Sequence, residues 1–403
     1  MAMAGRATAS RSRLASPSCS RTGSRAARSR RRWSRSRRCA STSRPRCSRP
    51  PRSPAPRPDP SHVTDANRRM RDDRIRRRTG FGFMLTDFDP TRPGKTIQDL
   101  GPITGPLDGV AGDVICCINN GEGGSVLLLG GIHGDEYEAQ IVLRQLAERL
   151  TPADVTGRLI IVPSLNFPAA QKGKRLSPFD GQNMNRCFPG KEDGTPTERL
   201  CAFVTKRLFP AVEILIDVHA GGGDVSVVPM VFGFATDKSV VDDARLNRLM
   251  EAWGYRFVQH VDGIDETACG AAKLADLASI EVEGGGGRMK PAELTIMEEG
   301  LLRALADFGA IKPKLAPVPF SGVHFTAGPE GHYLAREPAL VEHCIALGDQ
   351  VESGQLVARL YPTGGESAAA LEIRAPVSGY VLRQTEHTFV AKGQLVGNIG
   401  SLI

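Results

Sequence analysis

Short apolar runs and stretches with one apolar face alternate through the middle of the chain. An apolar run closed by two glycines predicts a buried strand at 125–129, and apolar residues at helical spacing predict a helix over 137–150. The same patterns predict strands at 158–163, 213–218 and 279–282, and helices at 198–209, 238–253 and 290–309. Strands that alternate with helices indicate an α/β fold, with a mostly parallel mixed sheet and helices on both faces.

From about Pro317 onward the pattern changes to short β runs separated by glycines, and helical periodicity is weak. This pattern predicts a small all-β unit over 317–403. Its expected strands are 340–345, 356–360, 370–373, 379–383 and 395–399. We therefore divide the chain into segments 1–80, 81–316 and 317–403.

The first 80 residues differ in charge from the rest. They hold 24 of the 52 basic and 4 of the 44 acidic residues, so 81–403 keeps 28 basic and 40 acidic residues and is acidic. We therefore expect no nucleic-acid partner for the folded part. Residues 1–60 are rich in Arg, Ser, Pro and Ala, which predicts disorder.

Three interpretations of this tail stay open. Its Arg- and Ser-rich composition fits a transit peptide or a basic nucleic-acid-binding arm. It also fits a start assigned too far upstream, with the true start near Met70 or Met84. We favour the last, because the composition is that of a GC-rich stretch read in an arbitrary frame.

The apolar stretches and the cysteines indicate the cellular compartment that we expect for the protein. No stretch approaches the about 20 apolar residues of a membrane-spanning helix, so we expect no membrane partner. Nine cysteines without a CxxC pair suggest reduced thiols in a cytoplasmic protein. The oligomeric state stays open, a homo-oligomer included.

Two of the eight histidines follow predicted strands at matching positions. His133 and Glu136 lie in GGIHGDEY, and His219 lies in LIDVHAGG. Sites in open α/β sheets form beyond the carboxyl ends of the strands. A lone histidine is usually a core or surface residue, but two imidazoles and one carboxylate with a fourth position for water are a catalytic zinc set. Their joint placement predicts one Zn²⁺ per chain.

Hydrolysis at such a centre needs a base, and the segment IEVEGGGG at 280–287 offers two carboxylates. Glu281 and Glu283 are two residues apart and therefore face the same side of a strand. A charged side chain in a buried strand lowers stability, so its presence there suggests a functional role. Glu281 or Glu283 is the expected base, and Glu283 also fits a solvated surface position. Asp135 and Asp217 are candidates to orient the imidazoles, and Asp135 fits a helix N-cap equally well.

A loop at 177–190 carries a candidate substrate clamp. Asn185 and Arg186 fit bidentate binding of a substrate carboxylate. An arginine that only ties down its own loop fits equally well.

The ordered motifs GGIHGDEYE, DGQNMNRCFPG, LIDVHAGG and IEVEGGGG resemble the succinylglutamate desuccinylase/aspartoacylase family, which has a zinc-carboxypeptidase-like fold. The resemblance covers about 95–310 and makes 81–316 a zinc hydrolase domain. It implies these roles by motif position: zinc ligands His133, Glu136 and His219, general acid/base Glu281, and substrate-carboxylate residues Asn185 and Arg186.

Within the family, GGIHGDEYE and FPG resemble the bacterial branch that includes the N-acetyl-2,4-diaminobutyrate deacetylases of ectoine degradation. An arginine that polarises the scissile carbonyl in aspartoacylase would fall near Pro168 and is missing, which leaves Arg175 as the nearest substitute. The resemblance implies a zinc-dependent deacylase for a small N-acylated amino acid, with N-acetyl-L-2,4-diaminobutyrate as the expected substrate. The alternatives are a zinc carboxypeptidase acting on peptides and a non-enzymatic binding protein on a hydrolase fold.

Segment 317–403 resembles a barrel-sandwich domain of the biotinyl/lipoyl type. Carriers of that type present a lysine at a hairpin tip, yet no lysine lies between Lys314 and Lys392. We therefore expect a role in structural cover or assembly.

Overall fold

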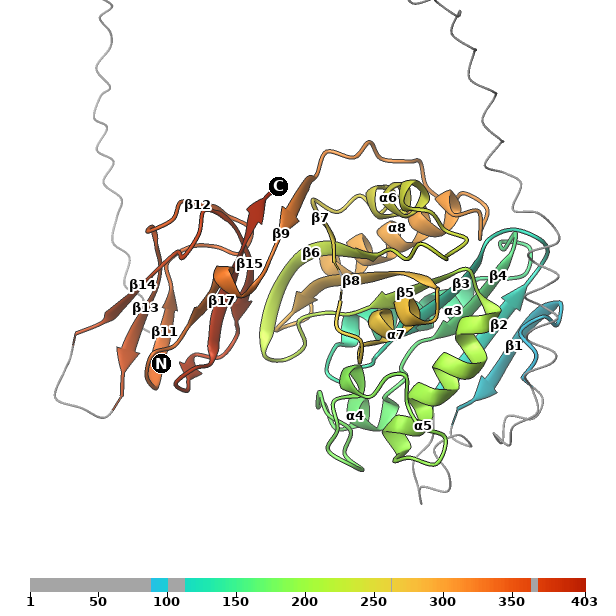
Figure 1. The fold of residues 1–403 in the computed structure, drawn as a ribbon, viewed down its shortest axis with the longest axis horizontal. Helices are drawn as coiled ribbons and strands as arrows, with labels where there is room; N and C mark the ends of the chain where they lie inside the picture. Colours follow the sequence, from blue (N-terminus) through green and yellow to red (C-terminus); the bar gives the residue numbers. More distant parts are fainter. Residues whose placement is uncertain (1–87, 101–112, 262, 364–368) are drawn as a thin grey trace, which may run out of the picture. The chain divides into compact units, whose positions relative to one another are not determined.

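The computed structural model describes residues 88–100, 113–261, 263–363 and 369–403. The tail 1–80, with its three interpretations, lies outside the described residues. All described residues belong to one compact unit, Asp59–Ile403. Among them the largest sheet has 13 strands and a second sheet has 4 (Figure 1).

The larger sheet begins with eight strands of mixed direction. In spatial order they are β1 (Gly94–Asp99), β2 (Val114–Asn119), β4 (Arg158–Val162), β3 (Ser125–Gly130), β5 (Ile214–Val218), β8 (Ala278–Gly286), β6 (Val225–Phe234) and β7 (Phe257–His260). The central pairs β4–β3, β3–β5 and β5–β8 are parallel, whereas β1–β2, β2–β4 and β8–β6 are antiparallel. The expected mixed α/β fold is confirmed.

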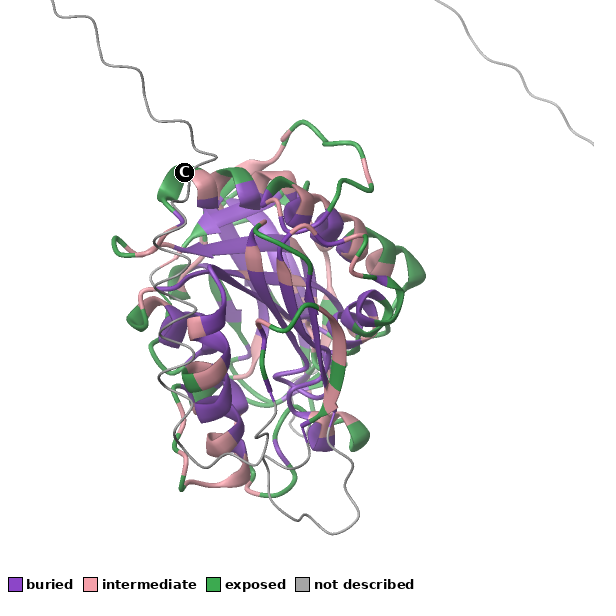
Figure 2. Ribbon diagram, turned by 90° about the vertical axis from the view of Figure 1, so that its right-hand side faces the viewer, coloured by how far each residue is buried: buried purple, intermediate pink, exposed green. Residues whose placement is uncertain are grey.

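Helices cover both faces of this sheet. On β3, Leu127 and Leu129 point into one hydrophobic cluster and Leu128 into the other. The cluster that holds Leu128 is closed by α3 (Tyr137–Arg149), α6 (Asp243–Ala252) and α8 (Pro291–Asp307). The other is closed by α5 (Pro196–Phe203), η2 (Val204–Leu208) and α7 (Ala268–Leu274). Figure 2 shows the strands as a buried layer.

Shorter helical segments lie in the connections: α4 (Phe167–Gln171), η1 (Met184–Arg186) and η3 (Phe209–Ala211). Among the described residues, no helix is both long enough and apolar enough to cross a membrane.

One predicted helix and one missed strand illustrate where the observed elements differ from the prediction. The helix predicted over 238–253 begins at Asp243, because the Asp242 side chain accepts a hydrogen bond from the Arg245 N–H at 2.7 Å and caps the helix there. Strand β6 was not predicted. Its apolar run contains Pro229, which ordinarily argues against a central strand. The structure accommodates this proline at a register shift between Val227 and Met230.

The segment after residue 317 is built mainly of strands. The smaller sheet contains β11 (Ala339–His343), β13 (Leu356–Pro362), β14 (Leu371–Arg374) and β16 (Phe389–Val390). The larger sheet takes β9 (Val323–Thr326), β10 (His332–Leu334), β12 (Gln350–Val351), β15 (Gly379–Thr385) and β17 (Leu395–Leu402), with the short helix η4 (Pro329–Gly331) between β9 and β10. Side chains from both sheets share one core. The barrel-sandwich type and the domain boundaries stay predictions.

The strand-rich segment joins the larger sheet through backbone pairing. Strand β15 runs antiparallel to the start of β6, with Arg383 opposite Val227 and Thr385 opposite Val225. Strand β9 pairs with β7. Arg383 thereby lies close to the strands that carry the candidate site.

Candidate metal centre

The candidate ligands come from the ends of two neighbouring parallel strands. Gly130, the last residue of β3, pairs with Val218, the last residue of β5. The chain therefore leaves both strands side by side, and His133 and His219 follow within a few residues. Gly131 makes the first turn with φ of +64°, in the left-handed region that favours glycine.

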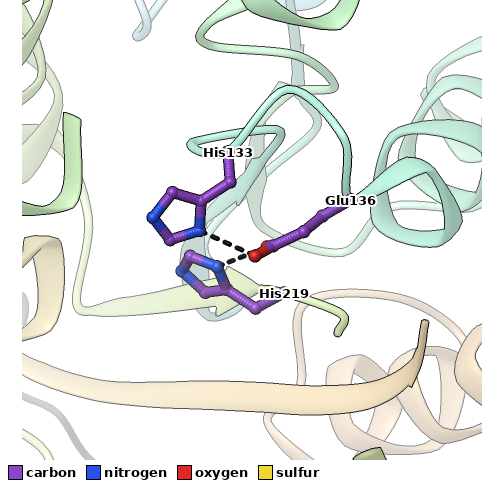
Figure 3. A group of neighbouring side chains, drawn as sticks. All are labelled: His133, Glu136 and His219. Atoms are coloured by element: carbon purple, nitrogen blue, oxygen red, sulfur yellow. Dashed lines mark hydrogen bonds and ion pairs between the residues drawn. The ribbon is translucent and has the colours of Figure 1, made fainter. Parts of the chain in front are cut away.

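The Glu136 carboxylate lies beside both imidazoles and contacts each of them (Figure 3). Its Oε1 is 2.7 Å from His133 Nδ1, and its Oε2 is 2.7 Å from His219 Nδ1. Each of the three residues is only 2% exposed. Their ligand atoms lie within 4.8 Å of one another, so the predicted group is brought together.

The far side of each imidazole contacts an oxygen. His133 Nε2 is 3.0 Å from Asn183 Oδ1, and His219 Nε2 is 3.0 Å from Asp217 Oδ2. These acceptors favour a proton on each Nε2 and direct each Nδ1 lone pair at the Glu136 carboxylate. A lone pair and a carboxylate oxygen repel at that distance unless a cation lies between them. The donor set therefore fits a divalent metal ion.

The charges of the group support the same conclusion. Burial by itself raises the pKa of Glu136, but His219 and His133 more than offset this and hold the pKa well below its usual value. Burial lowers the pKa of His219, whereas Asp217 and Glu136 raise it well above its usual value. The carboxylates of Glu136 and Asp217 thus require a positive charge nearby, either a proton on an imidazole or a cation between the rings. A bound metal ion supplies that charge while both imidazoles stay neutral.

The two candidate bases differ in their partners. One oxygen of Glu281 lies within 4.8 Å of ligand atoms of both Asp217 and His219. Burial, opposed by His219, raises the pKa of Glu281 to about 7. Glu283 instead contacts Arg383 of β15, with Oε1 3.2 Å from Nη2. Glu281 therefore lies beside Asp217 and His219, and no arginine in the described part of the chain donates a hydrogen bond to it.

The predicted substrate residues lie on two segments around the centre. Arg175 Nη1 donates to Glu136 Oε1 at 2.9 Å, and its side chain is 44% exposed. Asn185 is buried, and its Oδ1 accepts from the Ala268 N–H at 3.0 Å, which ties the loop to α7. Arg186 is exposed, and its Nη1 donates to the Asn185 carbonyl at 2.5 Å. The structure thus places Arg175 in direct contact with a candidate ligand.

Other residues near the centre correct or extend the sequence prediction. Asp217 contacts an imidazole as expected, whereas the Asp135 Oδ2 accepts from the Gly223 backbone N–H at 3.3 Å. Asn183 was not predicted, although it lies two residues before Asn185 in the same motif. Arg383 was also missed, because only the pairing of β15 with β6 brings it near.

A pocket of about 450 Å³ is lined in part by Arg175, which donates a hydrogen bond to Glu136. Its lining includes two cations, Lys174 and Arg175, and two carboxylates, Asp135 and Asp224. This mixed charge suits a small ligand that carries both signs of charge.

Comparison with known proteins agrees with this geometry. Residues 122–308 match the model of the succinylglutamate desuccinylase/aspartoacylase catalytic domain. An N-alpha-acetyl-L-2,4-diaminobutyric acid deacetylase of Halomonas elongata is 33% identical over 296 residues, which cover 72% of this chain and 85% of that protein.

Solved structures give the same result. A succinylglutamate desuccinylase from a Silicibacter species is 30% identical with a TM-score of 0.71, over 79% of this chain and 98% of that one. The product-bound ectoine utilization protein EutE (DoeB) of Ruegeria pomeroyi is 28% identical with a TM-score of 0.71, over 78% and 98% of the two chains. The chain described here belongs to the succinylglutamate desuccinylase/aspartoacylase family.

Proposed function

We propose that this protein is a zinc-dependent deacylase that hydrolyses the amide bond of a small N-acylated amino acid. Nα-acetyl-L-2,4-diaminobutyrate is the proposed substrate. The observation that carries the proposal is the buried group His133–Glu136–His219 with Glu281 beside it. The 33% identity to a deacetylase named for that substrate supports the choice of substrate.

His133 and His219 would hold the zinc ion through Nδ1, and Glu136 through its carboxylate. Zinc, when bound, polarises an amide carbonyl and lowers the pKa of a coordinated water towards about 7. Asn183 and Asp217 keep the imidazole rings turned so that Nδ1 faces the centre.

Glu281 is the proposed general base. Its pKa of about 7 suits a group that must accept and then release a proton near neutral pH. It takes a proton from the attacking water and passes it to the leaving nitrogen, so that the products are a carboxylate and a free amine. Glu283 is less suited to this role, because Arg383 holds one of its oxygens.

Arg175 and Arg186 are proposed to bind and orient the substrate. Arg186 is exposed, and a guanidinium can form two parallel hydrogen bonds to the substrate α-carboxylate. Arg175 donates a hydrogen bond to Glu136, and we propose that it also contacts the acyl carbonyl. Asn185 holds the loop that presents Arg186.

Zinc analysis combined with acetate release tests the proposal. We expect about one zinc per chain and turnover that is lost in chelator and restored by zinc. His219→Ala should lose both metal and turnover, whereas Glu281→Gln should keep the metal and lose turnover. Asp237→Asn, an exposed position, is the control. Full activity of metal-free protein would refute zinc dependence, and cleavage of peptides alone would favour a carboxypeptidase.

A further inference from the structure

Glu283 is a charged residue in a buried strand that the proposed mechanism does not use. It lies on β8 two residues after Glu281, so both side chains face the same side of the sheet. The Glu283 side chain is only 13% exposed, and its Oε2 is buried without a hydrogen-bond partner among the described residues. An unpaired buried carboxylate oxygen is costly, which suggests that a ligand completes it.

The surroundings of Glu283 connect it to the metal group. Burial raises the pKa of Glu283, Arg383 opposes that shift, and the charges of Glu136, His219 and Arg175 also act on it. One oxygen of Glu281 lies within 4.8 Å of ligand atoms of Asp217 and His219, and Glu283 lies two residues farther along the same face of β8.

Arg383 fixes one half of the Glu283 carboxylate. Its Nη2 is 3.2 Å from Oε1 of Glu283, and its side chain is 37% exposed. Because Arg383 comes from β15, this contact joins the strand-rich segment to the site strand β8. Oε1 is thus occupied, and Oε2 is left for a second donor.

We infer that Glu283 is a specificity-determining residue whose carboxylate binds an ammonium group on the amino-acid part of the substrate, and that Arg383 is its positioning residue. The inference rests on the proposed function. An Nα-acylated diamino acid keeps its second amine free, and such an amine is cationic at neutral pH. A substrate carboxylate would be repelled by Glu283, and an apolar side chain would leave Oε2 unpaired.

Two substrates that differ in one group test the role of Glu283. Nα-acetyl-L-2,4-diaminobutyrate carries the ammonium group, and Nα-acetyl-L-2-aminobutyrate lacks it. In Glu283→Gln we expect kcat/KM for the first to fall about 10- to 100-fold, the size of a lost charged hydrogen bond, with the second nearly unchanged. Glu122→Gln, at an exposed turn before β3, is the matched control.

Product binding gives a readout that does not depend on turnover. Calorimetry should show L-2,4-diaminobutyrate binding more weakly to zinc-loaded Glu283→Gln than to wild type, with L-2-aminobutyrate unaffected and zinc content unchanged. Equal loss of turnover on both substrates would make Glu283 a base and overturn the inference. An unchanged preference between the two products would overturn it as well.

Two substitutions test the role of Arg383, one that removes its charge and one that keeps it. Arg383→Met should weaken binding of L-2,4-diaminobutyrate and raise KM more than it lowers kcat, whereas Arg383→Lys should restore most of the affinity. Arg336→Met, an exposed arginine of the same segment, is the control. Unchanged product affinity in Arg383→Met would overturn its positioning role. If wild type hydrolyses neither substrate yet binds L-2,4-diaminobutyrate through Glu283, the proposed function fails and the inference on Glu283 stands.

Discussion

Substitution of Asp217 directly tests how a neighbouring side chain affects the metal affinity of His133, Glu136 and His219. Its carboxylate is fully buried, and its Oδ2 accepts a hydrogen bond from Nε2 of His219 at 3.0 Å. His133 has a neutral amide, Asn183, at the corresponding place and at the same distance. Asp217→Asn would therefore give both imidazoles an amide acceptor, with the ligands themselves unchanged.

The magnitude follows from this comparison. An amide oxygen still orients the ring but no longer makes it more basic, so the loss is partial. We expect zinc affinity to fall about 10- to 100-fold, or about 1.4 to 2.8 kcal/mol. Removal of a ligand, as in His219→Ala, should cost far more.

Competition with a chromogenic chelator at fixed pH measures this zinc affinity. Asp237→Asn makes the same chemical change at an exposed site and should bind zinc like wild type. Thermal unfolding of the metal-free variants checks that each is folded. A zinc Kd for Asp217→Asn within about twofold of wild type would show that the carboxylate does not tune His219, and the reasoning would fail.

Three further outcomes are expected. Folding raises the pKa of Glu281 from 4.5 to about 7, so in metal-free protein the free energy of unfolding should fall by at most about 3 kcal/mol as the pH rises from 4.5 to 7. Urea unfolding of Glu281→Gln should lack this dependence on pH. Gly134→Ala should lower Tm and weaken zinc, because the added Cβ would lie 2.2 Å from the Ala169 carbonyl carbon, and an unchanged Tm would contradict this. Arg186→Lys should raise KM about 10-fold with little change in kcat, and a selective loss of kcat would exclude a binding role.

The parts of the site that follow strands could be predicted from the sequence. His133 and His219 each come directly after an apolar run and beside glycines, and both signals are local. Glu281 lies within the next such strand and stays the predicted base, and its neighbours differ from those of Glu283. Strand β6 was missed because Pro229 interrupts its pattern. Arg383 has no local signal, since its position depends on pairing between residues more than 150 apart in the chain.

The pairing of β15 with β6 also bears on how the protein unfolds. The first residues of β6 have β8 on one side and β15 on the other. Separating the strand-rich segment would leave this edge of β6 with free backbone groups, which invites association with other chains. A chain truncated after residue 316 should therefore aggregate, and the intact protein should melt in a single cooperative transition. Two separate transitions would mean that the ladder between β6 and β15 adds little to stability.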